Sequence, residues 1–159
     1  MSKTQITAEQ GVPLIVMECE FDAPRELVFR AYIEPELMAR WVGPRYLTTT
    51  VDRWEAHDGG RWRFVQQAPD GSRHGFHGVF HGEVSPDETV RTFEYEGAPG
   101  HVALETLSMT ELPGGRTRVR TVSSFQAVQD RDAAISSGME GGVREGEERL
   151  RELLAELGG

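Results

Sequence analysis

Histidine side chains are the groups in this sequence that could transfer protons or bind a metal ion near neutral pH. His77 and His81 would share one face of a strand, yet four residues of extended chain separate them by about 13 Å. They could not both bind one ion, so a site would need His101 or Glu83 from elsewhere in the chain. We predict no metal site and no cofactor.

Cys19 is the only cysteine, which excludes an intrachain disulfide. It lies in a predicted strand with no base nearby in the sequence, and this favours a buried apolar thiol over a nucleophile. The sequence also lacks a phosphate-binding glycine loop, a dinucleotide-binding glycine fingerprint, an HExxH zinc pattern and a nucleophile elbow. The usual catalytic signatures are therefore absent.

The charge of the chain restricts its partners. A formal net charge of -9 repels nucleic-acid phosphates and anionic lipids. The basic cluster Arg116, Arg118 and Arg120 alternates along one predicted strand, and we interpret it as a solvated face. The longest apolar run, Val12–Met17, is far too short to span a membrane. Because its start has no apolar leader, we expect a cytoplasmic protein that binds neither nucleic acid nor membrane.

The 159 residues suit one domain, and turn signals built on glycine and proline divide them regularly. Segments rich in β-branched and aromatic residues lie between the turns. They predict strands near 12–21, 46–57, 61–67, 74–84, 89–96, 101–112 and 116–125. The short connections favour an antiparallel sheet. We predict a flexible segment over 1–11 and a single domain over 12–159.

Two helical regions are predicted. The first begins at Pro24, breaks at Glu34-Pro35 and continues as a second short helix that stops before Gly43. The second is one long helix from about Asp130 to Leu157. The order of elements is therefore a strand, two short helices, six strands and a long helix.

The long predicted helix has an amphipathic pattern, and its inner stripe changes along its length. Leucines occupy the C-terminal half, whereas the N-terminal half has Gly142 and Gly146 beside Met139 and Val143. Each interior glycine costs roughly 1 kcal/mol relative to alanine, so the glycines require an explanation. Three remain open: close approach of the sheet, a kink, or a helix kept thin beside an internal cavity.

Several motifs, in this order and spacing, resemble the START-like, or SRPBCC, superfamily, and most closely the bacterial relatives of the heat-shock-protein-90 ATPase activator domain. They are Phe21-Asp22-Ala23-Pro24-Arg25-Glu26-Leu27-Val28-Phe29, Glu34-Pro35, Trp41, Gly59-Gly60-Arg61-Trp62-Arg63-Phe64, Pro69-Asp70-Gly71, Gly78-Val79-Phe80 and Gly138-Met139-Glu140-Gly141-Gly142-Val143. The resemblance spans residues 12–157. It implies an α+β helix-grip (Bet v-like) fold, in which a curved antiparallel sheet of six or seven strands wraps around the C-terminal helix and leaves a cavity.

Such a fold implies a site for a small apolar or aromatic molecule. We expect the site to be formed by Trp41, Trp62, Phe64, Leu107, Met109, Phe125, Met139, Gly142, Val143 and Gly146, with Tyr46, His81 and Glu83 as polar candidates. His57 stands where the family often has arginine, and His81-Gly82-Glu83 follows a strand where the family tends to apolar and acidic residues. If these side chains face inward, the pocket would be unusually polar.

Two other functions remain open. Some superfamily members are polyketide cyclases or aromatases, so the chain could direct proton transfers with the acid–base candidates His77, His81, Glu83, Arg63 and Glu55. Alternatively, it could be a stress-response module that contacts a chaperone. A homodimer is compatible with each of these interpretations.

Overall fold

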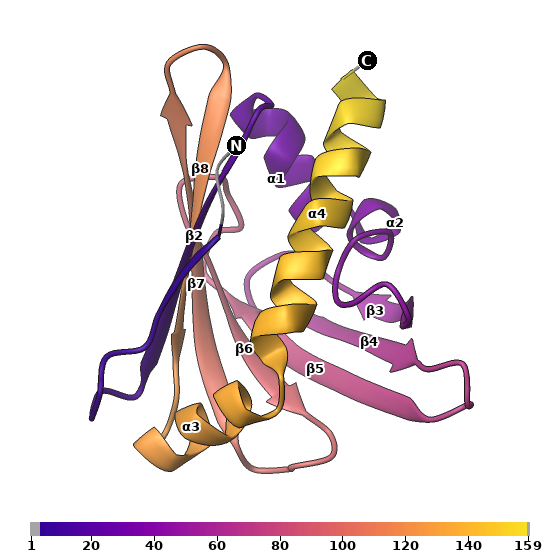
Figure 1. The fold of residues 1–159 in the computed structure, drawn as a ribbon, viewed down its shortest axis with the longest axis vertical. Coiled ribbons are helices and arrows are strands. Elements are labelled where there is room, and N and C mark those ends of the chain that lie inside the picture. The colour runs from indigo at the N-terminus through magenta and orange to yellow at the C-terminus, as the bar shows by residue number, and fades with distance from the viewer. Residues whose placement is uncertain (1–3, 159) are drawn as a thin grey trace.

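The structure, a computed structural model, describes residues 4–158 and has an α+β architecture (Figure 1). The strands are β1 (Gln5–Thr7), β2 (Leu14–Phe21), β3 (Thr48–Trp54), β4 (Arg61–Gln67), β5 (Arg73–His81), β6 (Thr89–Tyr95), β7 (Val102–Leu112) and β8 (Arg116–Ser124). The helices are α1 (Arg25–Ile33), α2 (Pro35–Met38), α3 (Val128–Ser136) and α4 (Met139–Gly158).

All strands belong to one antiparallel sheet with the order β1-β2-β8-β7-β6-β5-β4-β3. The predicted antiparallel sheet is confirmed, but the predicted six or seven strands are wrong because the sheet has eight. The additional strand is β1, which lies in the segment predicted to be flexible and pairs Gln5 with Glu18 and Thr7 with Val16. Its three residues are too few to show an alternating pattern in the sequence.

The sheet curves around α4, which lies along its concave side (Figure 1). Along each strand, every second side chain points toward this concave side. On β8, Thr117, Val119 and Ser123 are buried on this face, as the alternation predicts. No helix within residues 4–158 is long and apolar enough to cross a membrane.

Two tryptophans fix the end of α1. The last carbonyl groups of a helix have no partner within the helix and need one elsewhere. The indole Nε1 of Trp41 donates to the carbonyl oxygen of Ala31 at 2.8 Å, and that of Trp54 donates to the carbonyl oxygen of Ile33 at 2.7 Å. These bonds hold α1, α2 and β3 together at one end of the sheet.

The predicted long helix is in fact two helices. Helix α3 ends at Ser136 with Ser137 as its C-cap, and Gly138 adopts a φ of 85°, in the left-handed region that glycine tolerates best. The chain turns there and α4 begins at Met139, so the prediction of one helix from Asp130 is wrong. The predicted leucine stripe is buried at Leu150, Leu153 and Leu154.

The buried side chains form two clusters. One lies beneath α1 and α4 and includes Phe21, Val28, Met109 and Leu150. The other lies against β3–β6 and comprises Met38, Trp62, Phe64 and Phe80. The space between sheet and helix is only partly filled by these clusters.

Candidate functional site

A cavity of about 1040 Å³ lies between the concave face of the sheet and the helices. Its walls come from the strands β2–β8, the end of α1, α2 with the loop after it, α3 and the first half of α4. Most of the lining side chains are aromatic or aliphatic; they include Ile15, Met17, Tyr32, Ile33, Met38, Val42, Leu47, Trp54, Phe76, Phe80, Phe93 and Val119. Ligand sites in proteins occupy roughly 300–1,000 Å³, so the volume suits a small organic molecule.

The structure brings most of the residues expected at the site to this cavity. Those that line it are Trp41, Tyr46, Phe64, Leu107, Phe125, Met139, Gly142, Val143 and Gly146. Tyr46 lies at the rim, where 62% of its surface is exposed. The aromatic and aliphatic part of the expected site is therefore assembled from both sides, by the sheet and by α4.

Four of the expected residues lie elsewhere. Trp62 and Met109 are buried in the two core clusters and do not line the cavity. His81 and Glu83 are exposed, because Phe80 takes the inward position at the end of β5 and the next side chain must point outward. The expectation that His81 and Glu83 make the pocket polar is therefore wrong.

The glycines of α4 allow close approach, but to a loop and not to the sheet. A Cβ atom at Gly146 would lie 3.1 Å from both the backbone nitrogen of Gly43 and the carbonyl oxygen of Trp41. At Gly142 it would lie 3.3 Å from the Cδ atom of Pro44. Both glycines line the cavity, yet their small size is explained by the loop over residues 41–44 packing against the helix.

The first polar element of the cavity is an ion pair that sequence reasoning missed. Nε of Arg91 donates to Oε1 of Glu105 at 2.8 Å, and these residues are direct partners across β6 and β7. Glu105 precedes Leu107 by two residues, so the strand alternation that predicted Leu107 to face inward also placed Glu105 there. Glu105 was not predicted to line the site because charged side chains are seldom buried.

Another polar group of the cavity wall is the buried carboxylate of Glu147 on α4. Its side chain accepts a hydrogen bond of 2.5 Å from Oγ1 of Thr4. Burial raises the pKa of Tyr32 well above its usual value, and the negative charge of Glu147 adds to that shift. Burial also raises the pKa of Cys19 to about 11, again with a contribution from Glu147. Tyr32 and Cys19 are therefore neutral at physiological pH.

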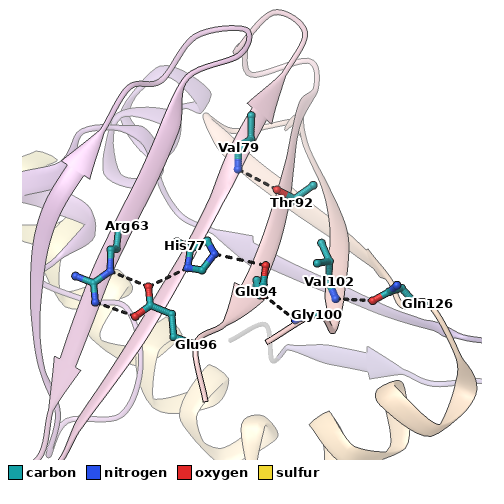
Figure 2. Close-up of polar contacts among 9 residues, drawn as sticks. All are labelled: Arg63, His77, Val79, Thr92, Glu94, Glu96, Gly100, Val102 and Gln126. Carbon is teal, nitrogen blue, oxygen red and sulfur yellow. Dashed lines mark hydrogen bonds and ion pairs between the residues drawn. The ribbon is translucent and has the colours of Figure 1, made fainter. Parts of the chain in front are cut away.

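The acid–base candidates from the sequence all lie outside the cavity. Arg63, His77, Glu94 and Glu96 form a polar network on the opposite face of the sheet (Figure 2). Glu96 accepts two bonds from Arg63, at 2.7 and 2.8 Å, and contacts Nδ1 of His77 at 2.8 Å. Nε2 of His77 lies 3.4 Å from Glu94. Glu55 accepts bonds from Arg53 and from the backbone of Arg61 in the β3–β4 connection.

The network predicts an acid-dependent part of the stability. The bonds from Arg63, with a smaller contribution from His77, lower the pKa of Glu96 from 4.5 to about 2. A carboxyl group whose pKa is lower in the folded state stabilises the fold above its unfolded pKa, and this stabilisation is lost as pH falls from about 4.5 to about 2. We expect Glu96→Gln to cost about 0.5–1 kcal/mol at neutral pH and to flatten the decline in melting temperature below about pH 4.5.

Glu111→Gln is the matched control for that experiment, because Glu111 is exposed and has no ion-pair partner within the described chain. Melting curves of the three proteins at neutral and acidic pH provide the test. Identical pH dependence of the wild type and the Glu96 variant would contradict the prediction.

Within the described part of the chain, no three histidine, cysteine, aspartate or glutamate side chains are placed to hold a metal ion. Two histidines do contact the cavity. Nδ1 of His101 lies 2.8 Å from Asp130, and Nδ1 of His74 lies 3.0 Å from the hydroxyl of Tyr95. Each histidine therefore has a polar partner and sits among the lining side chains of β5–β7 and α3.

An open antiparallel sheet wrapped around a C-terminal helix, with a cavity between them, defines a helix-grip domain of the SRPBCC class. The family model "Activator of Hsp90 ATPase homolog 1-like protein" matches residues 22–155. The chain belongs to this family.

Solved structures with the same fold cover nearly the whole chain. A crystal structure of a Rhodobacter sphaeroides protein is 25% identical, with a TM-score of 0.87, over 96% of this chain and 98% of that one. A solution structure of an Arthrobacter aurescens protein has the same identity and TM-score over 96% and 91% of the two chains. A Mycobacterium smegmatis protein is 20% identical, with a TM-score of 0.85, over 95% and 96%. No curated protein matches the chain.

Proposed function

We propose that this protein binds a small apolar or aromatic molecule in the cavity between the sheet and α4. The observation that carries the proposal is the cavity of about 1040 Å³ with its largely aromatic and aliphatic lining. Protein interiors are close-packed and contain few voids larger than a water molecule, so a cavity of this size needs a reason. The SRPBCC fold commonly binds hydrophobic ligands, which supports the same function.

The chemistry of the lining favours binding over covalent catalysis. The Cys19 thiol, with a pKa of about 11, is not an activated nucleophile. Tyr32 also stays protonated. The side chains that the sequence suggested for proton transfer lie outside the cavity. A cyclase or aromatase would therefore have to use other polar groups of the cavity wall, among them His74, His101, Glu105 and Glu147.

A cavity-filling substitution tests the proposal. Leu107 lines the cavity from β7, so the larger side chain of Leu107→Trp should occupy ligand space. We expect this variant to bind the neutral apolar dye Nile red at least about tenfold more weakly than the wild type, since filling the site excludes the ring of the probe. The measurement is a fluorescence titration with a melting curve for each protein.

Leu104→Trp is the matched control, because Leu104 lies on the same strand with 43% of its surface exposed and does not line the cavity. It should bind Nile red as the wild type does. Thr121→Phe provides a second filling variant from the neighbouring strand, where Thr121 pairs with Leu107. Unchanged dye binding by both folded filling variants would overturn the proposal.

A further inference from the structure

Arg91 is a charged side chain in the wall of a mainly apolar cavity. It lies on β6 among aromatic rings, and its side chain is only 23% exposed. The carbon of its guanidinium group is 4.3 Å from the ring centroid of Trp62 and 5.7 Å from that of Phe93. A cation is rarely placed in such surroundings without a partner, so its contacts indicate what the cavity accommodates.

The guanidinium group is held in place from two sides. Glu105 accepts a bond from Nε at 2.8 Å, and the guanidinium carbon lies over the ring of Trp62. Trp62 itself is only 1% exposed and stacks on Phe64 with 5.5 Å between ring centroids. Donors fixed in this way lose little conformational freedom when they bind a ligand, which favours affinity.

The remaining polar atoms of this pair are free to bind a ligand. Among the described residues, Nη1 and Nη2 of Arg91 have no hydrogen-bond partner, and neither has Oε2 of Glu105. Among residues 4–158, neither amino group of Arg91 belongs to the polar side-chain atoms that are fully buried without a hydrogen-bond partner. Both therefore keep some solvent-accessible surface, and Arg91 lines the cavity. A guanidinium group whose donors are unused is a strong site for an oxygen acceptor.

The surrounding charges favour an uncharged acceptor. Glu105 already offsets the charge of Arg91, and the wall also contains the carboxylates of Glu18, Asp130, Glu145 and Glu147. An anionic ligand would be repelled by these carboxylates and would leave water without full compensation. A ketone or amide oxygen carries no net charge, so the carboxylates do not repel it and no ion has to be removed from water. It can accept a hydrogen bond from Nη1 or Nη2 of Arg91.

We propose that the ligand is an uncharged aromatic molecule with a carbonyl oxygen, and that Arg91, positioned by Glu105 and Trp62, donates the hydrogen bond that orients it. This inference rests on the proposed function of the cavity. It adds a polar recognition site to a pocket that would otherwise select only by size and apolarity.

Three naphthalenes of similar size test the inference on the wild-type protein. They are acetylnaphthalene, which has a ketone; isopropylnaphthalene, which has the same shape without the acceptor; and naphthoate, which is anionic. We expect acetylnaphthalene to displace Nile red with about tenfold higher affinity than isopropylnaphthalene, as one additional hydrogen bond to a charged donor would give. Naphthoate should bind more weakly than the ketone.

The role of Arg91 is tested by Arg91→Met combined with Glu105→Met, so that neither an unpaired carboxylate nor a new amide donor is left in the wall. The double variant should lose the preference and bind the two uncharged naphthalenes with equal affinity. Arg63→Met, on the opposite face of the sheet, is the control and should keep the preference for the ketone.

Each outcome separates the inference from the function on which it rests. If the wild type binds Nile red but binds the two uncharged naphthalenes with equal affinity, the inference is overturned, whereas the proposed ligand binding is supported. Tighter binding of naphthoate than of the ketone would also overturn it. If the wild type binds none of the probes, the proposed function itself fails. Should the double variant not fold, the three affinities of the wild type still decide the matter.

Discussion

Iodoacetamide should alkylate Cys19 about a hundredfold more slowly in the folded protein than in the unfolded chain at about pH 8. The thiolate is the form that reacts, and its fraction falls tenfold for each unit by which the pKa rises. Burial is the main reason that the pKa of Cys19 rises from 9.0 to about 11. The side chain is only 6% exposed. Both effects slow the reaction.

The experiment follows the mass of the protein with time, in buffer and in guanidinium chloride. The Cys19→Ser variant contains no cysteine and should show no alkylation in either condition. The rate of the folded protein should continue to rise with pH until about pH 11. Equal rates for the folded and unfolded chains would contradict the prediction and would reopen Cys19 as a nucleophile.

Arg151 makes the Cys19 result informative. Its Nη2 atom lies 2.9 Å from the sulfur, an arrangement that by itself lowers the pKa of a thiol. Desolvation and the carboxylate of Glu147 outweigh this effect. The sequence could not reveal the balance, because Arg151, Glu147 and Cys19 meet only when α4 packs on β2.

The alternation of residues along strands accounts for what the sequence predicted well. Buried aromatic residues define which face is inward, and Phe64, Leu107 and Phe125 followed that rule. The same rule could have excluded His81, because it directly follows the core residue Phe80. It could also have included Glu105, which shares its face with Leu107. Residue type was given more weight than position in both cases.

Other features depended on tertiary contacts. Trp62 and Phe64 lie on the same face of β4. Arg91 and Phe93 pack over Trp62, so Trp62 does not line the cavity, whereas Phe64 does. The break at Gly138 had a local signal, since Ser136-Ser137-Gly138 resembles a helix end. The glycines of α4 had no such local signal in the sequence, because the loop that contacts them is about a hundred residues earlier in the chain.

That loop is held firmly against α4. Nη1 of Arg149 donates to the carbonyl oxygens of Gly43 and Pro44 at 3.2 and 3.3 Å, and Nη2 donates to that of Arg40 at 2.7 Å. The indole of Trp41 is bonded to α1 in turn. The backbone atoms that face Gly146 therefore cannot retreat without breaking these bonds.

Gly146→Leu should consequently destabilise the fold, with a net cost of about 1–3 kcal/mol in urea unfolding. Replacing an interior helical glycine recovers roughly 1 kcal/mol of helix propensity. The leucine must nevertheless displace Gly43 and Trp41 backbone atoms that already lie 3.1 Å from a Cβ position. Gly146→Ala, which adds only that Cβ, should be close to neutral because the gain and the crowding offset each other.

Gly141→Leu is the matched control on the same helix. Nothing lies within 4 Å of a Cβ atom at Gly141, and the residue is exposed. This variant should be as stable as the wild type or gain up to about 1 kcal/mol from helix propensity. If Gly146→Leu matched Gly141→Leu in stability and lost Nile red binding, the leucine would be filling the cavity. The glycine would then serve to keep ligand space open, and close packing of the loop would be the wrong explanation.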